Sequence, residues 1–136
     1  MKSLVGKVKI GSPAVTNGGG TMGIQWLNDF FTACAGQCNI DFVAFHWYDS
    51  ASNFAYFEKH VNDVITAANN NGVAKVWLTE FAPSGSADAQ ASFMKQAVEF
   101  LDSNTSVERY AAFMASPDTL LSGTSLNTIG SAYASA

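Results

Sequence analysis

Charged residues are scarce in this sequence, and positive charge is the scarcest. Of 136 residues, 7 are Lys or Arg and 11 are Asp or Glu, which gives a net charge of −4. Nucleic-acid binding needs clustered basic side chains that contact phosphates, and no basic stripe occurs, so we expect no nucleic-acid partner. The sequence also lacks an apolar run of about 18 residues, which a membrane span requires, so we expect no membrane partner.

The chain is also short. A complete (β/α)8 barrel typically takes about 250 residues, which is far more than the 136 present. Disorder is excluded by an apolar content of 48% and an aromatic content of 12%, because disordered chains are poor in both. Residues 1–136 are therefore predicted to form a single domain with its own core.

Only two cysteines occur, Cys34 and Cys38. They fit either two reduced core thiols or a small disulfide that closes a helix end, and the disulfide is favoured. No further ligands lie nearby, so we expect no metal and no cofactor. A disulfide would mark an oxidising compartment, and few charges with many Ser, Thr, Asn, Gly and Ala are typical of a secreted protein. We therefore expect secretion, as a mature form, because no apolar leader follows Met1.

The hydrophobic pattern alternates strands with helices along the chain. Strands are predicted at 7–15, 41–47, 74–81 and 107–114, and helices at 24–33, 53–71, 86–103 and 128–134. Strands that alternate with helices of ten or more residues pair in parallel through right-handed crossovers. The predicted fold class is therefore α/β, with four βα units.

Polar and aromatic residues gather at the predicted carboxyl ends of these strands, where ligands of parallel α/β sheets bind. By the two-residue period of a strand, Glu80 shares a face with Val76 and Leu78. Glu80 is either a strand-end side chain in solvent or a carboxylate aimed into a cleft. Aromatic rings beside a carboxylate are typical of carbohydrate sites. The residues predicted to bind glycan are Asn17, His46, Trp47, Tyr48, Asp49, Glu80 and Phe113.

Some of these residues also fit ordinary structural roles. His46 fits a core histidine with one backbone partner as well as a sugar ligand, and Trp47 fits plain packing of the core. His60, in the middle of a predicted helix, is expected to be solvated. Asn104 begins an Asn-Thr-Ser triplet, a glycosylation acceptor pattern that also arises by chance.

Four motifs in order resemble the glycosyl hydrolase catalytic core of glycoside hydrolase family 128. They are SPAVTN at 12–17, IDFVAFHWY at 40–48, WLTEFA at 77–82 and VERYAAF at 107–113. The tail at 116–134 and the cysteine pair before the second strand are similar too, so the resemblance covers nearly the whole chain. It implies β-1,3-glucan activity, a (β/α)8 barrel and a retaining mechanism, with the chain matching strands five to eight only.

The same resemblance implies individual roles. Glu80 matches the nucleophile after the seventh strand, His46, Trp47 and Tyr48 match the substrate-lining group after the sixth, and Asn17 lies in the loop after the fifth. The family's general acid/base Glu follows the fourth strand and has no counterpart here. Ala112 also departs from the family, which often has an aromatic residue at that place.

A retaining hydrolase needs two carboxyl groups roughly 5–5.5 Å apart, and only Asp49 and Asp118 are placed to join Glu80. Half of a barrel also leaves two open sheet edges. Two chains can complete an eight-stranded structure, or the sheet can flatten into an α/β/α sandwich with its edges paired across a symmetric dimer. Both arrangements predict a homodimer, and the sandwich is favoured because the terminal segments can cover the exposed face.

Two functions are predicted from these features. The first is a secreted, lectin-like carbohydrate-binding protein, similar to small fungal lectins, that kept the sugar-binding edge and lost the second carboxylate. The alternative is an endo-β-1,3-glucanase, as a fragment or as a dimer that borrows a carboxylate from its partner. The missing acid favours the first, and Glu80 in its full motif favours the second. A structural or signalling role without sugar is the third hypothesis.

Overall fold

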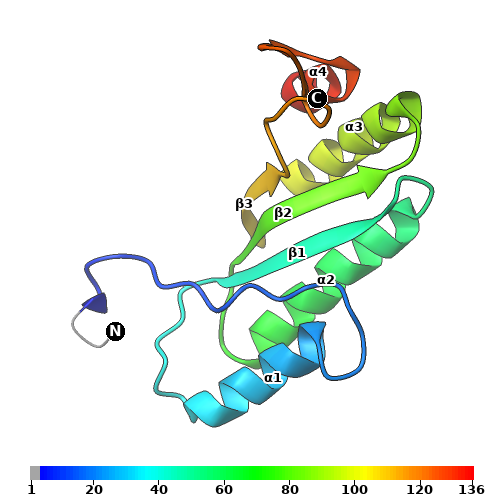
Figure 1. The fold of residues 1–136 in the computed structure, drawn as a ribbon. Coiled ribbons are helices and arrows are strands. Elements are labelled where there is room, and N and C mark those ends of the chain that lie inside the picture. The colour runs from blue at the N-terminus through cyan, green and yellow to red at the C-terminus, as the bar shows by residue number, and fades with distance from the viewer. Residues whose placement is uncertain (1–3) are drawn as a thin grey trace.

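The computed structural model describes residues 4–136, which form a parallel sheet packed against helices (Figure 1). The elements are α1 (Gly23–Cys34), β1 (Val43–Ser50), α2 (Phe54–Asn70), β2 (Val76–Ser84), α3 (Ala87–Ser103), β3 (Val107–Ala112), β4 (Leu121–Ser122), β5 (Ser125–Leu126) and α4 (Thr128–Ser135). The main sheet has the order β1-β2-β3 with parallel pairing, while β4 and β5 form a short antiparallel pair. The predicted α/β class is confirmed.

The segment predicted as the first strand, 7–15, is extended but does not form a regular strand. It lies along β1 through two isolated bridges, Gly11 to Phe42 and Val15 to Phe45. Pro13 lies between these bridges and has no N–H to donate. In this stretch the Ala44 N–H donates to the hydroxyl of Ser12, at 3.0 Å, and not to a backbone carbonyl. A side chain thus replaces one backbone hydrogen bond between this segment and β1. The prediction of a regular strand at 7–15 is therefore corrected: the segment is extended and pairs with β1 only in part.

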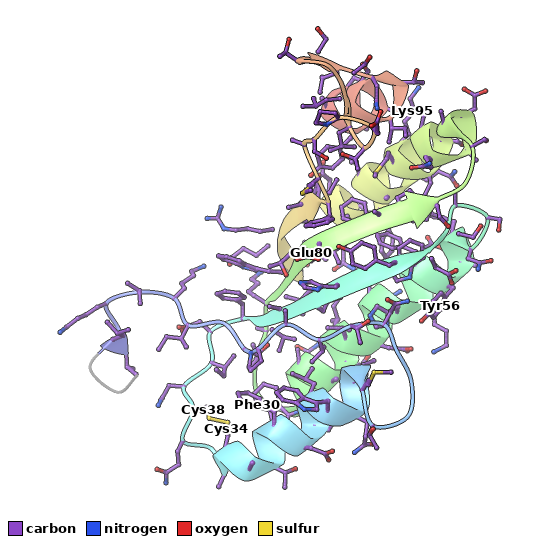
Figure 2. The ribbon with its side chains drawn as sticks, viewed as in Figure 1. Phe30, Cys34, Cys38, Tyr56, Glu80 and Lys95 are labelled. Carbon is purple, nitrogen blue, oxygen red and sulfur yellow. A yellow bond between two sulfur atoms is a disulfide. The ribbon has the colours of Figure 1, made fainter. Side chains whose placement is uncertain are left out.

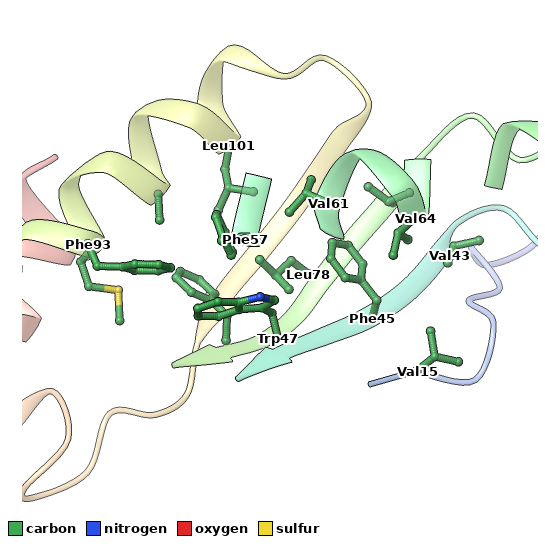
Figure 3. Packing of buried hydrophobic residues seen from close by; sticks show 14 of the residues in the cluster. Val15, Val43, Phe45, Trp47, Phe57, Val61, Val64, Leu78, Phe93 and Leu101 are labelled. Carbon is green, nitrogen blue, oxygen red and sulfur yellow. The ribbon is translucent and has the colours of Figure 1, made fainter. Parts of the chain in front are cut away.

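The core lies on one face of the sheet, between the strands and helices α2 and α3 (Figure 3), and Leu27 of α1 joins it. Phe45 and Trp47 of β1 point to this face and are fully buried. The Trp47 ring stacks on Phe93 of α3 and meets Phe57 of α2 edge-on, both with centroids 5.1 Å apart. Burial of these rings against α2 and α3 fixes both helices on the same side.

The opposite face of the sheet, called here the open face, carries half-exposed side chains and no helix of the described residues. The C-terminal helix α4 packs against α3, and its Tyr133 lies beside Phe81 and Tyr110 on the core side, at 6.1 and 6.3 Å. Apolar Ile129 and Ala132 are buried there, so this terminal segment does not cover the open face. One helical layer on one sheet face is the arrangement of half a barrel, and the second helical layer of the expected sandwich is not formed in residues 4–136.

The predicted disulfide is confirmed. Cys34, the last residue of α1, is bonded to Cys38, with Cα atoms 5.4 Å apart (Figure 2). The bond closes the turn after α1, where Ala35 adopts a left-handed conformation with φ of 47°. None of the helices in the described part of the chain has the length and apolar character to cross a membrane.

His60 is the clearest departure from the sequence-based assignment of surface residues. It was predicted to be solvated, but it is 5% exposed on α2 and packs against Phe45 at 5.8 Å. The prediction is wrong because α2 buries a wide face that includes Phe57, Val61 and Val64, and position 60 falls at its margin. Its Nε2 makes no hydrogen bond within the described residues.

We expect the stability of the fold to decrease as pH falls through the titration of His60. Burial lowers the pKa of this imidazole below its ordinary value of 6.5, against smaller opposing effects of Asp63 and a backbone hydrogen bond to His46. The unfolded chain therefore takes up the proton first, so stability present above about pH 6.5 is lost below it, with a slope of at most about 1.4 kcal/mol per pH unit. Urea unfolding between about pH 7.5 and pH 5 measures the slope, which His60→Gln should reduce; an identical slope in this variant would contradict the assignment.

Candidate functional site

A β-bulge places Glu80 on the open face. The pairing of β1 with β2 runs Phe45 to Leu78 and then His46 to Glu80, so Thr79 is an extra residue. The Thr79 hydroxyl donates to the Phe45 carbonyl at 3.4 Å. One inserted residue reverses the side-chain alternation that follows it. Leu78 therefore faces the core while Glu80 faces outward, and the prediction that Glu80 shares a face with Val76 and Leu78 is wrong.

Two side chains of β1 hold the Glu80 carboxylate. The Tyr48 hydroxyl donates to Oε2 at 2.5 Å, and Nδ1 of His46 lies 3.5 Å from the same oxygen. The side chains of His46 and Glu80 are 25% and 33% exposed, so the carboxylate stays open to a ligand. Burial and the hydrogen bond to Glu80 raise the pKa of Tyr48. Tyr48 is therefore a protonated donor at neutral pH.

Phe113 adds an aromatic wall to this site. It follows β3, and its N–H donates to the Phe81 carbonyl at 2.9 Å. Its ring meets Tyr48 edge-on, with centroids 6.1 Å apart. Both rings are exposed, at 42% and 40%, so their faces are accessible to a ligand. The structure thus brings together four of the predicted residues, His46, Tyr48, Glu80 and Phe113.

Two predicted residues are directed elsewhere. Trp47 is fully buried on the core face, because the two-residue period that turns His46 and Tyr48 outward turns Trp47 inward. Its predicted contact with sugar is wrong, and its role is packing. Asp49 accepts hydrogen bonds from the Ser50 N–H at 2.7 Å and from Asn53 at 3.2 Å. Both of its oxygens are used in the loop before α2, which leaves none directed at a ligand of Glu80.

Asn17 lies at this edge of the sheet, but its amide is bonded within the protein. The oxygen accepts the Tyr48 N–H and the nitrogen donates to the Tyr48 carbonyl, both at 3.1 Å. The predicted contact of Asn17 with glycan is therefore replaced by a contact with β1. Asp118, the other candidate for a second carboxyl, lies in the turn that precedes β4, with φ of 67° and its N–H bonded to Leu121. No hydrogen bond or ion pair links it to the Glu80 site.

Sequence reasoning missed two residues that shape the site. Thr79 creates the bulge, and an inserted residue leaves no periodic signal that could reveal it. Tyr56 of α2 bonds to Asn17 through its hydroxyl, although its place in the helix pattern gives no hint of a polar partner. In the described part of the chain, no group of three or more His, Cys, Asp or Glu side chains is arranged to hold a metal ion.

The open face is hollowed between β2 and β3 by a cavity of about 370 Å³, lined by Trp77, Leu78, Thr79, Arg109, Tyr110 and Ala111. Thr79, one of its lining residues, precedes Glu80 in the sequence. Arg109 lies over the Trp77 ring at 5.0 Å, and Trp77 Nε1 donates to Glu108 at 2.7 Å. Lys9 also pairs with Glu108, and these two hydrogen bonds lower the pKa of the Glu108 carboxyl. Glu108 is thus committed to a charged cluster at the amino ends of the strands, away from Glu80.

A family model described as the glycosyl hydrolase catalytic core matches residues 2–133. The chain belongs to this family, glycoside hydrolase family 128. Among curated proteins it is similar to alkali-sensitive linkage protein 1 of Schizosaccharomyces pombe, with 38% identity over 111 residues. The match covers 76% of this chain and 19% of that protein.

Solved family 128 structures share the fold. A curdlan-specific exo-β-1,3-glucanase of Blastomyces gilchristii, determined with glucose, is 39% identical with a TM-score of 0.95, over 100% of this chain and 58% of that one. An endo-β-1,3-glucanase of Sorangium cellulosum is 30% identical with a TM-score of 0.80, over 94% of this chain and 55% of that one. The chain therefore has a β-1,3-glucanase-like fold and spans little more than half the length of these structures. Its sheet and helices correspond to part of a family 128 barrel.

Proposed function

We propose that the edge formed by His46, Tyr48, Glu80 and Phe113 binds β-1,3-glucan, and that Glu80 is the nucleophile of a retaining glycosidase site. The observation that carries the proposal is a carboxylate on the open face, oriented by a phenol at 2.5 Å and an imidazole at 3.5 Å. It is supported by the likeness of this chain to an exo-β-1,3-glucanase determined with glucose. Phe113 offers a ring face for the apolar side of a sugar.

Under this proposal the two oxygens of Glu80 have different roles. Oε2 accepts the Tyr48 hydroxyl, and no hydrogen bond occupies Oε1 among the described residues, so Oε1 is the attacking atom. Its electron pair forms a bond to the anomeric carbon while the glycosidic bond breaks, and the departing oxygen keeps the bonding pair. In a natural glucan that oxygen must then be protonated by a general acid. Water later cleaves the glycosyl ester and regenerates the carboxylate.

The second carboxyl is supplied from outside the described residues under this proposal. Asp49 is bonded within its own loop, and among the described residues no hydrogen bond or ion pair joins Asp118 to the site. One observation favours a second candidate function, lectin-like glycan binding without hydrolysis: Glu80 is the one carboxylate that the described residues bring to the His46–Tyr48 edge. Covalent labelling of Glu80 by an activated β-1,3-linked disaccharide would decide for the nucleophile, and glycan binding without any labelling would decide for the lectin-like function.

We also propose that the protein is secreted, or held in a cell wall, and of fungal origin. The Cys34–Cys38 disulfide forms and persists in oxidising compartments. The fission yeast relative supports a fungal source. Intact disulfide in protein recovered from culture medium supports this location, and retention of reduced protein inside cells contradicts it.

A homodimer is the assembly we propose for the chain by itself. Met114 is exposed beside the open face, at 45%, and among the described residues no further strand pairs with the outer edge of β3. A second copy can pair with this edge and cover Met114, since unpaired sheet edges favour association. Light scattering should give twice the 14.4 kDa chain mass, and a monomer at micromolar concentration would contradict the dimer.

The nucleophile is tested by covalent labelling of Glu80 with an activated β-1,3-linked disaccharide. Such a substrate releases its leaving group without a general acid, so the test does not require the second carboxyl.

A further inference from the structure

Tyr48, which orients Glu80, lies where β1 is no longer paired with the 7–15 segment. On this side of β1, the His46 N–H donates to the Val15 carbonyl of the 7–15 segment at 2.8 Å. After Val15 that segment turns away into a loop. The next rung of the ladder, at Tyr48, would therefore leave one N–H and one carbonyl without a backbone partner, which carries a free-energy cost when water is restricted.

The side chain of Asn17 supplies the missing rung. Its oxygen accepts the Tyr48 N–H and its nitrogen donates to the Tyr48 carbonyl, each at 3.1 Å. A carboxamide has the same donor and acceptor as a peptide group, so it can continue the ladder by one residue. The donor and acceptor pattern also fixes which end of the amide is oxygen.

Tyr56 of α2 holds Asn17 in turn. Its hydroxyl donates to the backbone carbonyl of Asn17 at 2.9 Å. The same hydroxyl accepts the second hydrogen of the Asn17 side-chain amide at 3.3 Å. The Tyr56 ring lies against Trp47 in the core, with centroids 6.2 Å apart. Every hydrogen of the Asn17 amide and of the Tyr56 hydroxyl is thus used, and the loop is anchored to a rigid helix. Without this anchor, the three glycines after Asn17 would leave the loop free to move.

We propose that Asn17 and Tyr56 are positioning residues that fix the backbone of Tyr48 and thereby the carboxylate of Glu80. This Asn17–Tyr56 clamp contacts no sugar; it acts from behind the site, through β1. The inference rests on the proposed role of Glu80 as nucleophile. Its physical basis is the steep dependence of reaction rate on the placement of reacting groups.

Tyr56→Phe is the sharpest variant, because it removes two hydrogen bonds and keeps the ring against Trp47. The rate constant for release of dinitrophenolate from 2,4-dinitrophenyl β-laminaribioside should fall about tenfold in Tyr56→Phe and about a hundredfold in Asn17→Ala. The dissociation constant for laminaripentaose should change by about twofold or less, because the clamp acts on the rate and not on uniform binding. Tyr110→Phe is the matched control: it loses a hydroxyl bonded to Asp102 at 2.6 Å and should retain the wild-type rate.

Two further measurements test the clamp without catalysis. The Tyr48 amide should exchange hydrogen slowly in wild type and Tyr110→Phe, and faster in Tyr56→Phe and Asn17→Ala. Because its bond to Glu80 contributes to the raised pKa of Tyr48, the Tyr48 phenol, followed by nuclear magnetic resonance, should titrate at lower pH when the clamp is broken.

The outcomes separate the two proposals. Normal labelling of wild type with no change in rate, exchange or titration in Tyr56→Phe and Asn17→Ala would overturn the clamp and leave Glu80 as nucleophile. Absence of labelling in wild type would overturn the proposed function, and the exchange and titration measurements would then decide the clamp. A loss of affinity equal to the loss of rate would also overturn it, because that result indicates direct sugar contact.

Discussion

Wild-type protein mixed with 2,4-dinitrophenyl β-laminaribioside is expected to release one equivalent of dinitrophenolate rapidly and then stop. The dinitrophenolate anion is stable enough to depart unprotonated, so the first step needs the nucleophile alone. Oε1 of Glu80 has no hydrogen bond among the described residues and is free to attack the anomeric carbon. Without a general base the resulting glycosyl ester accumulates, and mass spectrometry should find the disaccharide on the peptide that contains Glu80.

Azide should restart turnover, because this anion attacks the ester without a base. Glu80→Gln should reduce the rate constant of the burst by more than about 10⁴-fold, as expected for loss of a nucleophile. The matched control is Glu108→Gln, which removes a carboxylate bonded to Lys9 and Trp77 and should leave the burst unchanged. Label on another carboxyl group, or a burst that survives in Glu80→Gln, would show that Glu80 is not the nucleophile.

Trp47→Ala is expected to destabilise the fold by about 3–5 kcal/mol, the range for large aromatic residues removed from cores. Trp47 is 0% exposed and contacts rings of both α2 and α3. Because a domain of this size has a free energy of unfolding of about 5–15 kcal/mol, the substitution would remove a large part of it. The urea midpoint and the thermal midpoint should both decrease, and sugar binding would fall only in proportion to the folded fraction.

Trp26→Ala is the matched control for that experiment. Trp26 is 43% exposed and stacks on Phe30 at the surface of α1, so its removal should cost about 1 kcal/mol or less. If Trp47→Ala kept wild-type stability and lost only sugar binding, the assignment of Trp47 to the core would be wrong. The two variants compare the same residue type in buried and exposed places.

Most residues of the site were identifiable from the sequence, but the face of the sheet to which each side chain points was not. His46, Tyr48, Glu80 and Phe113 stand at strand ends, and that position alone predicts one shared edge. The side-chain period within the motif at 46–48 also separates Trp47 from its neighbours, yet the sequence offered no means to decide which face would be covered by helices. Burial of Phe45 and Trp47 against α2 and α3 made that choice.

The sequence by itself determined the α/β class, most of the order of helices and strands and the family, and it favoured the local disulfide, because these depend on periodicity, short motifs and near neighbours in the chain. The tertiary structure decided the face of Glu80, through the extra residue Thr79 in the register with β1. It also decided the burial of His60 and the use of Asn17 as a backbone substitute held by Tyr56. The bulge at Thr79 and the contacts of Asn17 depend on hydrogen bonds between residues 31 to 39 positions apart, and only the packing of α2 and the 7–15 segment against β1 brings those residues together.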